Sequence, residues 1–238
     1  MTTLTFDSVK IFHELDFLRE DSELIRKVRA CIDAQRKTGA HMLESYFQLN
    51  PNAAYEVSEE ALWAIMRSGE LISDIRTDRS ISNCIAFNSK NLEGSVLNDE
   101  LLSMRRETDR ILSGRIKKLF VDGQRLSVED SGHFWYPPGG YMGWHTNVRT
   151  PGWRMYINYA EEPGKSFFRY RDPETGQIVT SWDEEWNFRL FRIDRGKPFW
   201  HAVYSETNRF SLGYKIAMIP RRSLTDRITN KFYQLLKV

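Results

Sequence analysis

The sequence has few cysteines, almost no net charge and no long apolar run. Only two cysteines, Cys31 and Cys84, occur in 238 residues, too few for a disulfide framework, so a reducing cytoplasmic location is expected. The 34 Lys and Arg residues nearly balance the 32 Asp and Glu residues, and a net charge of +2 disfavours a dedicated nucleic-acid-binding protein. No stretch approaches the roughly 18 apolar residues of a membrane span, and the N-terminus lacks the apolar core of a secretory signal.

Aromatic residues, in contrast, are plentiful and unevenly distributed. Between His133 and Tyr204 lie 18 of the 31 Phe, Tyr and Trp residues, including six of the seven Trp. Aromatic side chains favour strands. This bias predicts a helical N-terminal part, residues 1–115, that packs on a β-rich C-terminal part, residues 116–238, within one domain.

Three N-terminal segments space their apolar side chains three to four residues apart, which predicts amphipathic helices. They are residues 22–37, 59–75 and 99–119. We expect the first to start at Ser22 and stop before Gly39, and the second to be capped by Ser58. Residues 223–238 are expected to form a closing helix. All of these helices are interpreted as packing scaffold.

The C-terminal part is typical of short strands separated by turns that contain Gly and Pro. The predicted strands are residues 132–138, 153–161, 166–173, 177–182, 186–194, 199–206 and 209–219. No helical pattern alternates with them, so a parallel α/β fold is disfavoured and a sandwich or barrel is favoured.

Two histidines of this region are candidate metal ligands. His145 and His201 are 56 residues apart, so only neighbouring strands can bring their rings together. Arg154 follows the first histidine by nine residues, and Arg209 follows the second by eight. Two imidazoles and two guanidinium groups match a metal ion beside a dianionic small molecule, because imidazole binds iron and arginine binds carboxylates with two hydrogen bonds. Ser211 lies two residues after Arg209 and shares its strand face.

The pattern from His145 to Ser211 resembles the distal half of the site in Fe(II)/2-oxoglutarate-dependent oxygenases. In that family a His-x-Asp element precedes a distal His and then a basic residue that binds the tail carboxylate of 2-oxoglutarate. Here Asn147 stands in place of the acid. This is similar to the two-histidine aspartyl/asparaginyl β-hydroxylases, in which an Arg-Met strand follows at the spacing of Arg154-Met155. The resemblance covers about residues 132–218.

The resemblance implies an α+β fold, a double-stranded β-helix (jelly roll) with packed N-terminal helices. It implies that His145 and His201 hold Fe(II), that Arg209 and Ser211 bind the C5 carboxylate of 2-oxoglutarate, and that Arg154 and the neighbouring Tyr156 line the co-substrate pocket. The implied activity is a dioxygenase that couples 2-oxoglutarate decarboxylation to hydroxylation. Its partners would be O₂ and an amino-acid, peptide or small-metabolite substrate.

Three roles remain open for Asn147. Its amide oxygen could be a third iron ligand, it could turn away and leave a coordination position for water or chloride, or it could cap the turn before Pro151. Three acidic residues, Asp130, Asp183 and Asp194, are weighed as the third ligand but interpreted as turn or surface residues. His133 is interpreted as a core or substrate-facing residue.

Three other functions are compatible with the same residues. They are a binding module that has lost turnover, a 2-oxoglutarate-dependent halogenase, and a cupin-like metal protein, which has no general need for Arg154 and Arg209. Trp144, Trp153 and Trp200 are candidates for an apolar wall around the metal. Arginines in the strands, Arg189 among them, alternate with acids and are interpreted as a solvated mixed face rather than a nucleic-acid surface.

Overall fold

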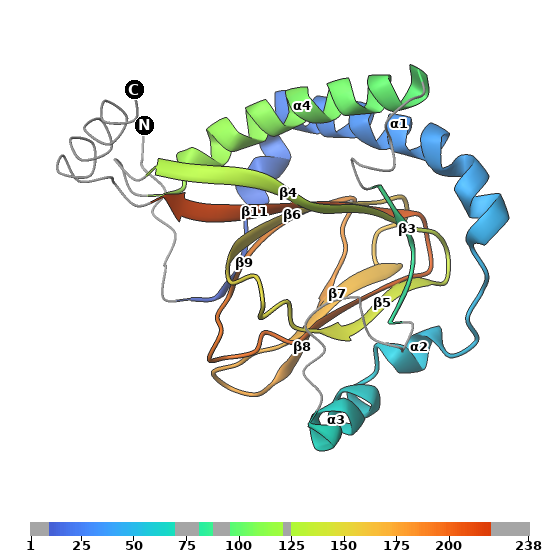
Figure 1. The fold of residues 1–238 in the computed structure, drawn as a ribbon, viewed down its shortest axis with the longest axis vertical. Helices are drawn as coiled ribbons and strands as arrows, with labels where there is room; N and C mark the ends of the chain where they lie inside the picture. Colours follow the sequence, from blue (N-terminus) through green and yellow to red (C-terminus); the bar gives the residue numbers. More distant parts are fainter. Residues whose placement is uncertain (1–9, 70–80, 88–95, 121–124, 220–238) are drawn as a thin grey trace, which may run out of the picture.

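The described strands form two antiparallel sheets that face each other across a shared interior (Figure 1). The structure is a computed structural model that describes residues 10–69, 81–87, 96–120 and 125–219. Aromatic side chains from both sheets meet in the interior, with Phe168 and Tyr170 on one sheet packing against Phe12 and Phe191 on the other.

The larger sheet has six strands in the order β1-β9-β6-β11-β4-β3. Their bounds are β1 Phe12–Glu14, β9 Trp186–Ile193, β6 Gly152–Ala160, β11 Arg209–Ile219, β4 Arg125–Tyr136 and β3 Ile85–Ala86. The smaller sheet has five strands in the order β2-β5-β10-β7-β8. Their bounds are β2 Ser82–Asn83, β5 Gly140–His145, β10 His201–Ser205, β7 Ser166–Arg171 and β8 Ile178–Trp182.

The chain crosses repeatedly between the two sheets. From β4 to β11 it alternates between them, apart from the β7–β8 hairpin, which lies wholly in the smaller sheet. Every pairing is antiparallel, and strands distant in sequence become neighbours, as in β11 with both β4 and β6. This is the strand order of a double-stranded β-helix, a jelly roll with two packed sheets. The predicted α+β fold class is confirmed.

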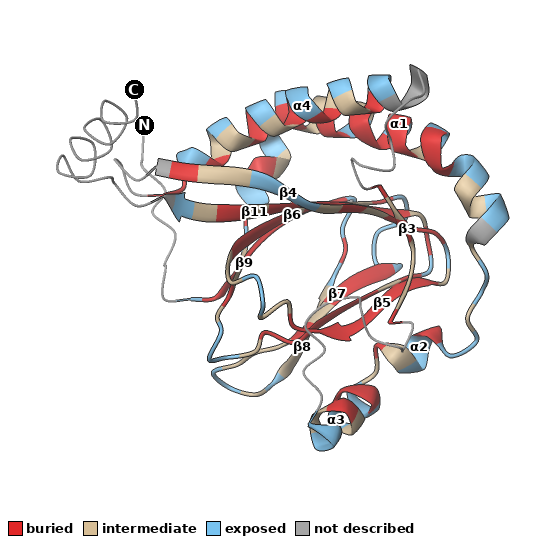
Figure 2. Cartoon of the chain, in the orientation of Figure 1, coloured by how far each residue is buried: buried red, intermediate tan, exposed pale blue. Residues whose placement is uncertain are grey.

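The helices cover the outer faces of the sheets (Figure 1). Helices α1 (Ser22–Tyr46) and α4 (Val96–Lys117) lie side by side across the larger sheet, and the short helix η1 (Asp16–Glu20) lies beside them. Helices α2 (Ala53–Glu56) and α3 (Glu59–Ser68) pack against the smaller sheet. In Figure 2 the buried residues of α1 and α4 face the sheet, and the exposed ones face outward.

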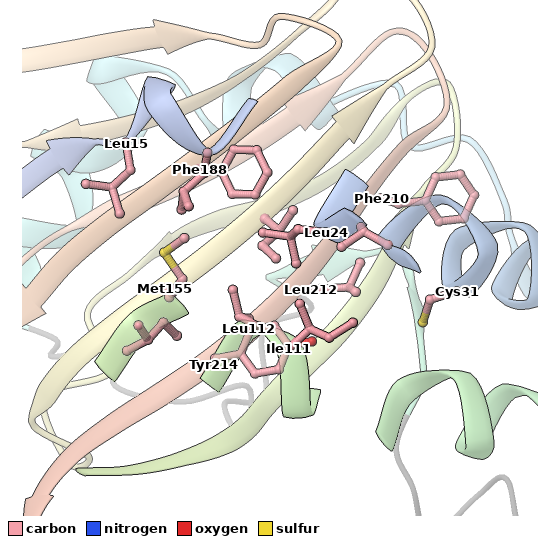
Figure 3. Close-up of a cluster of buried hydrophobic side chains, with 14 of the residues drawn as sticks. Leu15, Leu24, Cys31, Ile111, Leu112, Met155, Phe188, Phe210, Leu212 and Tyr214 are labelled. Atoms are coloured by element: carbon pink, nitrogen blue, oxygen red, sulfur yellow. The ribbon is translucent and has the colours of Figure 1, made fainter. Parts of the chain in front are cut away.

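The core between the helices and the larger sheet fixes which side chains face the interior. On β11, Phe210, Leu212 and Tyr214 point toward Leu24 of α1 and its neighbours (Figure 3). Because successive strand residues point to opposite faces, Arg209 and the other odd-numbered residues at the start of β11 face the space between the sheets. Packing of the apolar residues of β11 against the helices therefore directs Arg209 toward the interior.

Most predicted helices and strands are found in the described residues, but several bounds differ. The second predicted helix, residues 59–75, ends at Ser68, the strand predicted at residues 132–138 is the end of the longer β4, and β5 was not predicted. The clearest error lies in α1. This helix is capped by Asp21, whose carboxylate accepts a hydrogen bond from the Leu24 amide at 3.1 Å, and it continues through Gly39 to Tyr46. A Cβ at Gly39 would stand 2.9 Å from the Phe87 ring and 3.1 Å from the Trp135 ring, so this glycine permits close packing rather than ending the helix.

The N-terminal part also supplies strands that the periodicity did not predict. These are β1, β2 and β3, which pair at sheet edges. The predicted boundary between residues 115 and 116 falls in the last turn of α4, and a division into two parts stays a prediction. Residues 223–238 lie outside the described residues. Among the helices that the structure describes, none is long and apolar enough to cross a membrane.

Candidate metal and co-substrate site

His145 and His201 lie side by side in the smaller sheet. His145 ends β5, His201 begins β10, and the two residues are direct partners in the register of these strands. Their ring centroids are 4.0 Å apart and both side chains are buried. Two residues far apart in sequence are therefore adjacent in space, as the metal-site hypothesis requires.

Hydrogen bonds to the backbone define the tautomer of both rings. His145 Nδ1 lies 2.9 Å from the Gly143 carbonyl oxygen, and His201 Nδ1 lies 2.9 Å from that of Phe199. A carbonyl only accepts, so each Nδ1 carries the hydrogen and each Nε2 keeps a lone pair. Burial lowers the pKa of His145 to about 4 and, with the neighbouring His145 and Arg154, lowers that of His201 well below its ordinary value. Both imidazoles are neutral at physiological pH, the state that binds a metal.

Phenylalanines, not tryptophans, lie around the His201 ring. The rings of Phe168, Phe191 and Phe199 each lie 5.6 Å from the His201 ring. In contrast, Trp144 and Trp200 pack under α2 and α3, and Trp153 packs on the helix side of the larger sheet. Because neighbours on a strand face opposite ways, the three candidate tryptophans pack in the core and do not line the site.

The Asn147 side chain lies at the same point. Its amide Nδ2 is 3.3 Å from His201 Nε2. Asn147 also has a left-handed backbone conformation, with φ of 55°, and its carbonyl accepts a hydrogen bond from the Thr150 amide at 3.0 Å. The residue therefore shapes the turn after β5, and its side-chain amide lies beside His201.

Arg209 and Ser211 begin β11 and face the interior between the sheets. Arg209 is fully buried, and its Nε donates to Asp183 Oδ2 at 2.7 Å. Among the described residues, neither terminal nitrogen of Arg209 has a hydrogen-bond partner. The Ser211 oxygen accepts a hydrogen bond from Asn158 Nδ2 at 2.9 Å, which leaves the hydroxyl hydrogen for another acceptor. A buried guanidinium with two unpartnered nitrogens is suited to a carboxylate.

Arg154 and Tyr156 line the same interior from β6. Arg154 is buried, and its terminal nitrogens bond to the Trp153 carbonyl and to Thr150. Burial raises the pKa of the Tyr156 phenol, whereas the nearby Arg154 and Arg209 lower it, so this side chain is within electrostatic range of both guanidinium groups.

Asp183 and Arg189 are where the sequence interpretation fails. Asp183 was expected at a turn or on the surface and Arg189 on a solvated face, yet both are buried and Arg189 Nη1 donates to Asp183 Oδ1 at 2.5 Å. Burial alone would raise the pKa of the Asp183 carboxyl, but the Arg209 and Arg189 guanidinium groups lower it to about 2. Nothing in the local pattern shows that one aspartate meets two arginines of other strands.

The other candidate acids lie away from the histidine pair. Asp130 bonds Arg105 of α4 at 3.0 Å, and Asp194 pairs with Arg192. His133 accepts a hydrogen bond from Arg105 Nε at 2.9 Å on the helix side of the larger sheet, so it is a core residue. Within the described part of the chain, no cluster of three or more His, Cys, Asp or Glu is arranged to hold a metal.

No family model and no curated protein matches this chain, but solved structures do. One is an oxidoreductase of the 2OG-Fe(II) oxygenase family from Burkholderia pseudomallei, at 10% identity and a TM-score of 0.39, covering 57% of this chain and 65% of that one. Another is a prolyl-4-hydroxylase from Pseudomonas putida, at 14% identity and a TM-score of 0.35, covering 69% and 84%. A third is a prolyl hydroxylase from Trichoplax adhaerens, solved with a peptide fragment of hypoxia inducible factor, at 13% identity and a TM-score of 0.37, covering 84% and 94%.

This chain spans just under two thirds of the Burkholderia structure. Because the TM-scores are below 0.5, the argument about this chain rests on its own strands and on the residues described above.

Proposed function

We propose that this protein is an Fe(II)/2-oxoglutarate-dependent dioxygenase that hydroxylates a C–H bond of an amino acid, peptide or small metabolite. The observation that carries the proposal is that two features face the same interior between the sheets. A pair of neutral, adjacent imidazoles lies in one sheet, and the facing sheet holds a buried arginine, Arg209, whose two terminal nitrogens have no partner among the described residues. Packing alone does not explain the arginine, because buried polar nitrogens without partners destabilise a fold.

In this proposal His145 and His201 hold the ferrous ion through their Nε2 atoms. The hydrogen bonds from Nδ1 to backbone carbonyls fix the ring orientation, as such bonds do for metal-binding histidines at known sites. When bound, the iron and 2-oxoglutarate supply O₂ activation and C–H oxidation. The protein's own contribution is to hold the two imidazoles neutral and to place the Phe168, Phe191 and Phe199 rings around His201, where they exclude water.

Asn147 is proposed as the third protein ligand, through its amide oxygen. Two ligand atoms at about 2.1 Å from one metal, at right angles, are about 3.0 Å apart. The 3.3 Å between the Asn147 amide nitrogen and His201 Nε2 is close to that spacing, and rotation of the amide by half a turn would place its oxygen there. A neutral ligand set should bind Fe(II) more weakly than one with a carboxylate.

Arg209 and Ser211 are proposed to bind the C5 carboxylate of 2-oxoglutarate. The two terminal nitrogens of Arg209 can donate in parallel to the two carboxylate oxygens, and the Ser211 hydroxyl can add a third bond. Arg154 and Tyr156 extend this lining toward His201.

The test is anaerobic titration of the purified protein with Fe(II) and 2-oxoglutarate, monitored by the visible charge-transfer band of the complex. We expect the wild type to develop the band, His201→Ala to lose it with its Fe(II) affinity, and Arg209→Ala to require at least about tenfold more 2-oxoglutarate. Arg209→Lys, which keeps the charge but not the paired donors, should lie between them.

A band that neither substitution changes would contradict the assigned residues. Admission of O₂ then separates the remaining functions. Release of succinate in step with 2-oxoglutarate loss supports the oxygenase, whereas tight 2-oxoglutarate binding without succinate indicates a binding module. Incorporation of chloride into product would indicate a halogenase.

A further inference from the structure

A chain of hydrogen bonds joins the two side chains proposed to bind the tail of 2-oxoglutarate. Arg209 Nε donates to one oxygen of Asp183 at 2.7 Å, and Arg189 Nη1 donates to the other at 2.5 Å. The same Arg189 nitrogen donates to Asn158 Oδ1 at 3.1 Å, and Asn158 Nδ2 donates to Ser211 Oγ at 2.9 Å. The chain begins at the guanidinium of Arg209 and ends at the hydroxyl of Ser211.

The linking residues come from different elements and are all buried. Asn158 lies on β6, Arg189 lies on β9, and Asp183 follows β8. Each is exposed by 1% or less of its surface. Ser166 of β7 also donates to Asp183, at 2.5 Å. A buried network with its members held by several strands has little rotamer freedom, so it is rigid.

The charges of the network leave one guanidinium edge for a ligand. Asp183 stays ionised because its pKa is lowered to about 2, and its charge is shared between Arg189 and Arg209. Arg189 has further partners in Ser181 and Glu14. Among the described residues, Arg209 has a hydrogen-bond partner, Asp183, only at its Nε, so its terminal nitrogens keep N–H donors for a ligand in the interior.

We propose that Asp183, Arg189 and Asn158 are positioning residues that select a five-carbon 2-oxo diacid over its four- and six-carbon homologues. This inference rests on the proposed function. They hold Arg209 and Ser211 at a fixed distance from the histidine pair. In the diacid, each added or removed methylene changes the distance between the 2-oxo acid group and the tail carboxylate. A rigid clamp discriminates against such a change, whereas a mobile arginine follows the carboxylate.

The experiment compares the wild type with Asp183→Asn. Anaerobic titrations with Fe(II) yield dissociation constants for 2-oxoglutarate, oxaloacetate and 2-oxoadipate. We expect the wild type to prefer 2-oxoglutarate. In Asp183→Asn the 2-oxoglutarate constant should rise about tenfold, the preference over both homologues should shrink, and Fe(II) affinity should be unchanged.

Asp130→Asn is the matched control. Asp130 also pairs with a buried arginine, Arg105, but on the helix side of the larger sheet, so this variant should keep the wild-type preference. If Asp183→Asn does not fold, Asn158→Ala replaces it, because it breaks the chain at the Ser211 end without removing a charge. Its preference for 2-oxoglutarate should also shrink.

Two results overturn the inference and differ from failure of the proposed function. A folded variant that keeps the wild-type constants excludes positioning, and one that weakens all three diacids equally shows a merely structural role. If instead the wild type binds none of the three, the proposed function itself fails, and the inference falls with it.

Discussion

Asn147 combines two roles that substitution can separate. Its left-handed φ of 55° shapes the turn after β5, and its amide lies 3.3 Å from His201 Nε2. Aspartate and glycine also adopt this backbone conformation readily. Asn147→Asp and Asn147→Gly therefore keep the turn and change only the group at the histidine pair.

We expect Asn147→Asp to bind Fe(II) about tenfold more tightly than the wild type, because a carboxylate adds negative charge beside a dication. Asn147→Gly should bind it about tenfold more weakly, because a ligand is lost. Anaerobic competition with a chelating dye measures both constants. Equal affinities for the wild type and Asn147→Gly would show that the amide is not a ligand.

At the scale of elements, replacing two helical glycines with alanine should have opposite effects on the free energy of unfolding. Gly39 of α1 lies against Phe87 and Trp135, where an added Cβ would be 2.9 Å and 3.1 Å from their rings. Gly39→Ala should therefore lower the free energy of unfolding by about 1–3 kcal/mol through overpacking. Gly114 of α4 has nothing within 4 Å of the same position, so Gly114→Ala should raise it by about 0.5–1 kcal/mol. Urea unfolding of both variants measures the contrast, and a stabilised Gly39→Ala would contradict the packing.

At this scale the sequence determines elements whose ends depend on local residues, but not those whose ends depend on distant contacts. Turn residues predicted the boundaries of β6 to β11 to within a few residues, because Gly and Pro interrupt strands locally. The continuation of α1 beyond Gly39 depends on Phe87 and Trp135, which are distant in sequence. The edge strands β2 and β3, two residues each, are too short to carry a periodic pattern.

At the scale of the whole molecule, buried histidines make stability depend on pH. Burial and the nearby Arg105 lower the pKa of His133 well below its ordinary value, so it is neutral in the folded protein. Below about pH 6.5 the unfolded chain binds a proton that the folded chain does not, so stability falls as the pH falls from about 7 to 5. His145 and His201 act with the same sign.

His133→Asn should make stability depend less on pH, because the unfolded variant has one fewer histidine that binds a proton at low pH. The asparagine amide oxygen can still accept the Arg105 hydrogen bond. Melting temperatures of metal-free protein between pH 5 and pH 8 measure the slope. A variant with the wild-type slope would show that His133 is not a source of the pH dependence.

The candidate site was only partly accessible from the sequence. The spacing of His145, Arg154, His201 and Arg209 suggested a common site, and strand alternation explains why Ser211 shares the face of Arg209. Asp183 could not be recognised, because its partners lie on β9 and β11 and meet it only when the sheets close. The roles of the candidate site residues in binding iron and 2-oxoglutarate stay predictions.

The most direct measurement is a crystal structure of the protein grown anaerobically with Mn(II), in place of Fe(II), and 2-oxoglutarate. We expect one anomalous peak within about 2.3 Å of Nε2 of both His145 and His201, with the tail carboxylate of 2-oxoglutarate on the terminal nitrogens of Arg209. Well-diffracting crystals with no metal between the two rings, or with 2-oxoglutarate bound away from Arg209, would contradict the account.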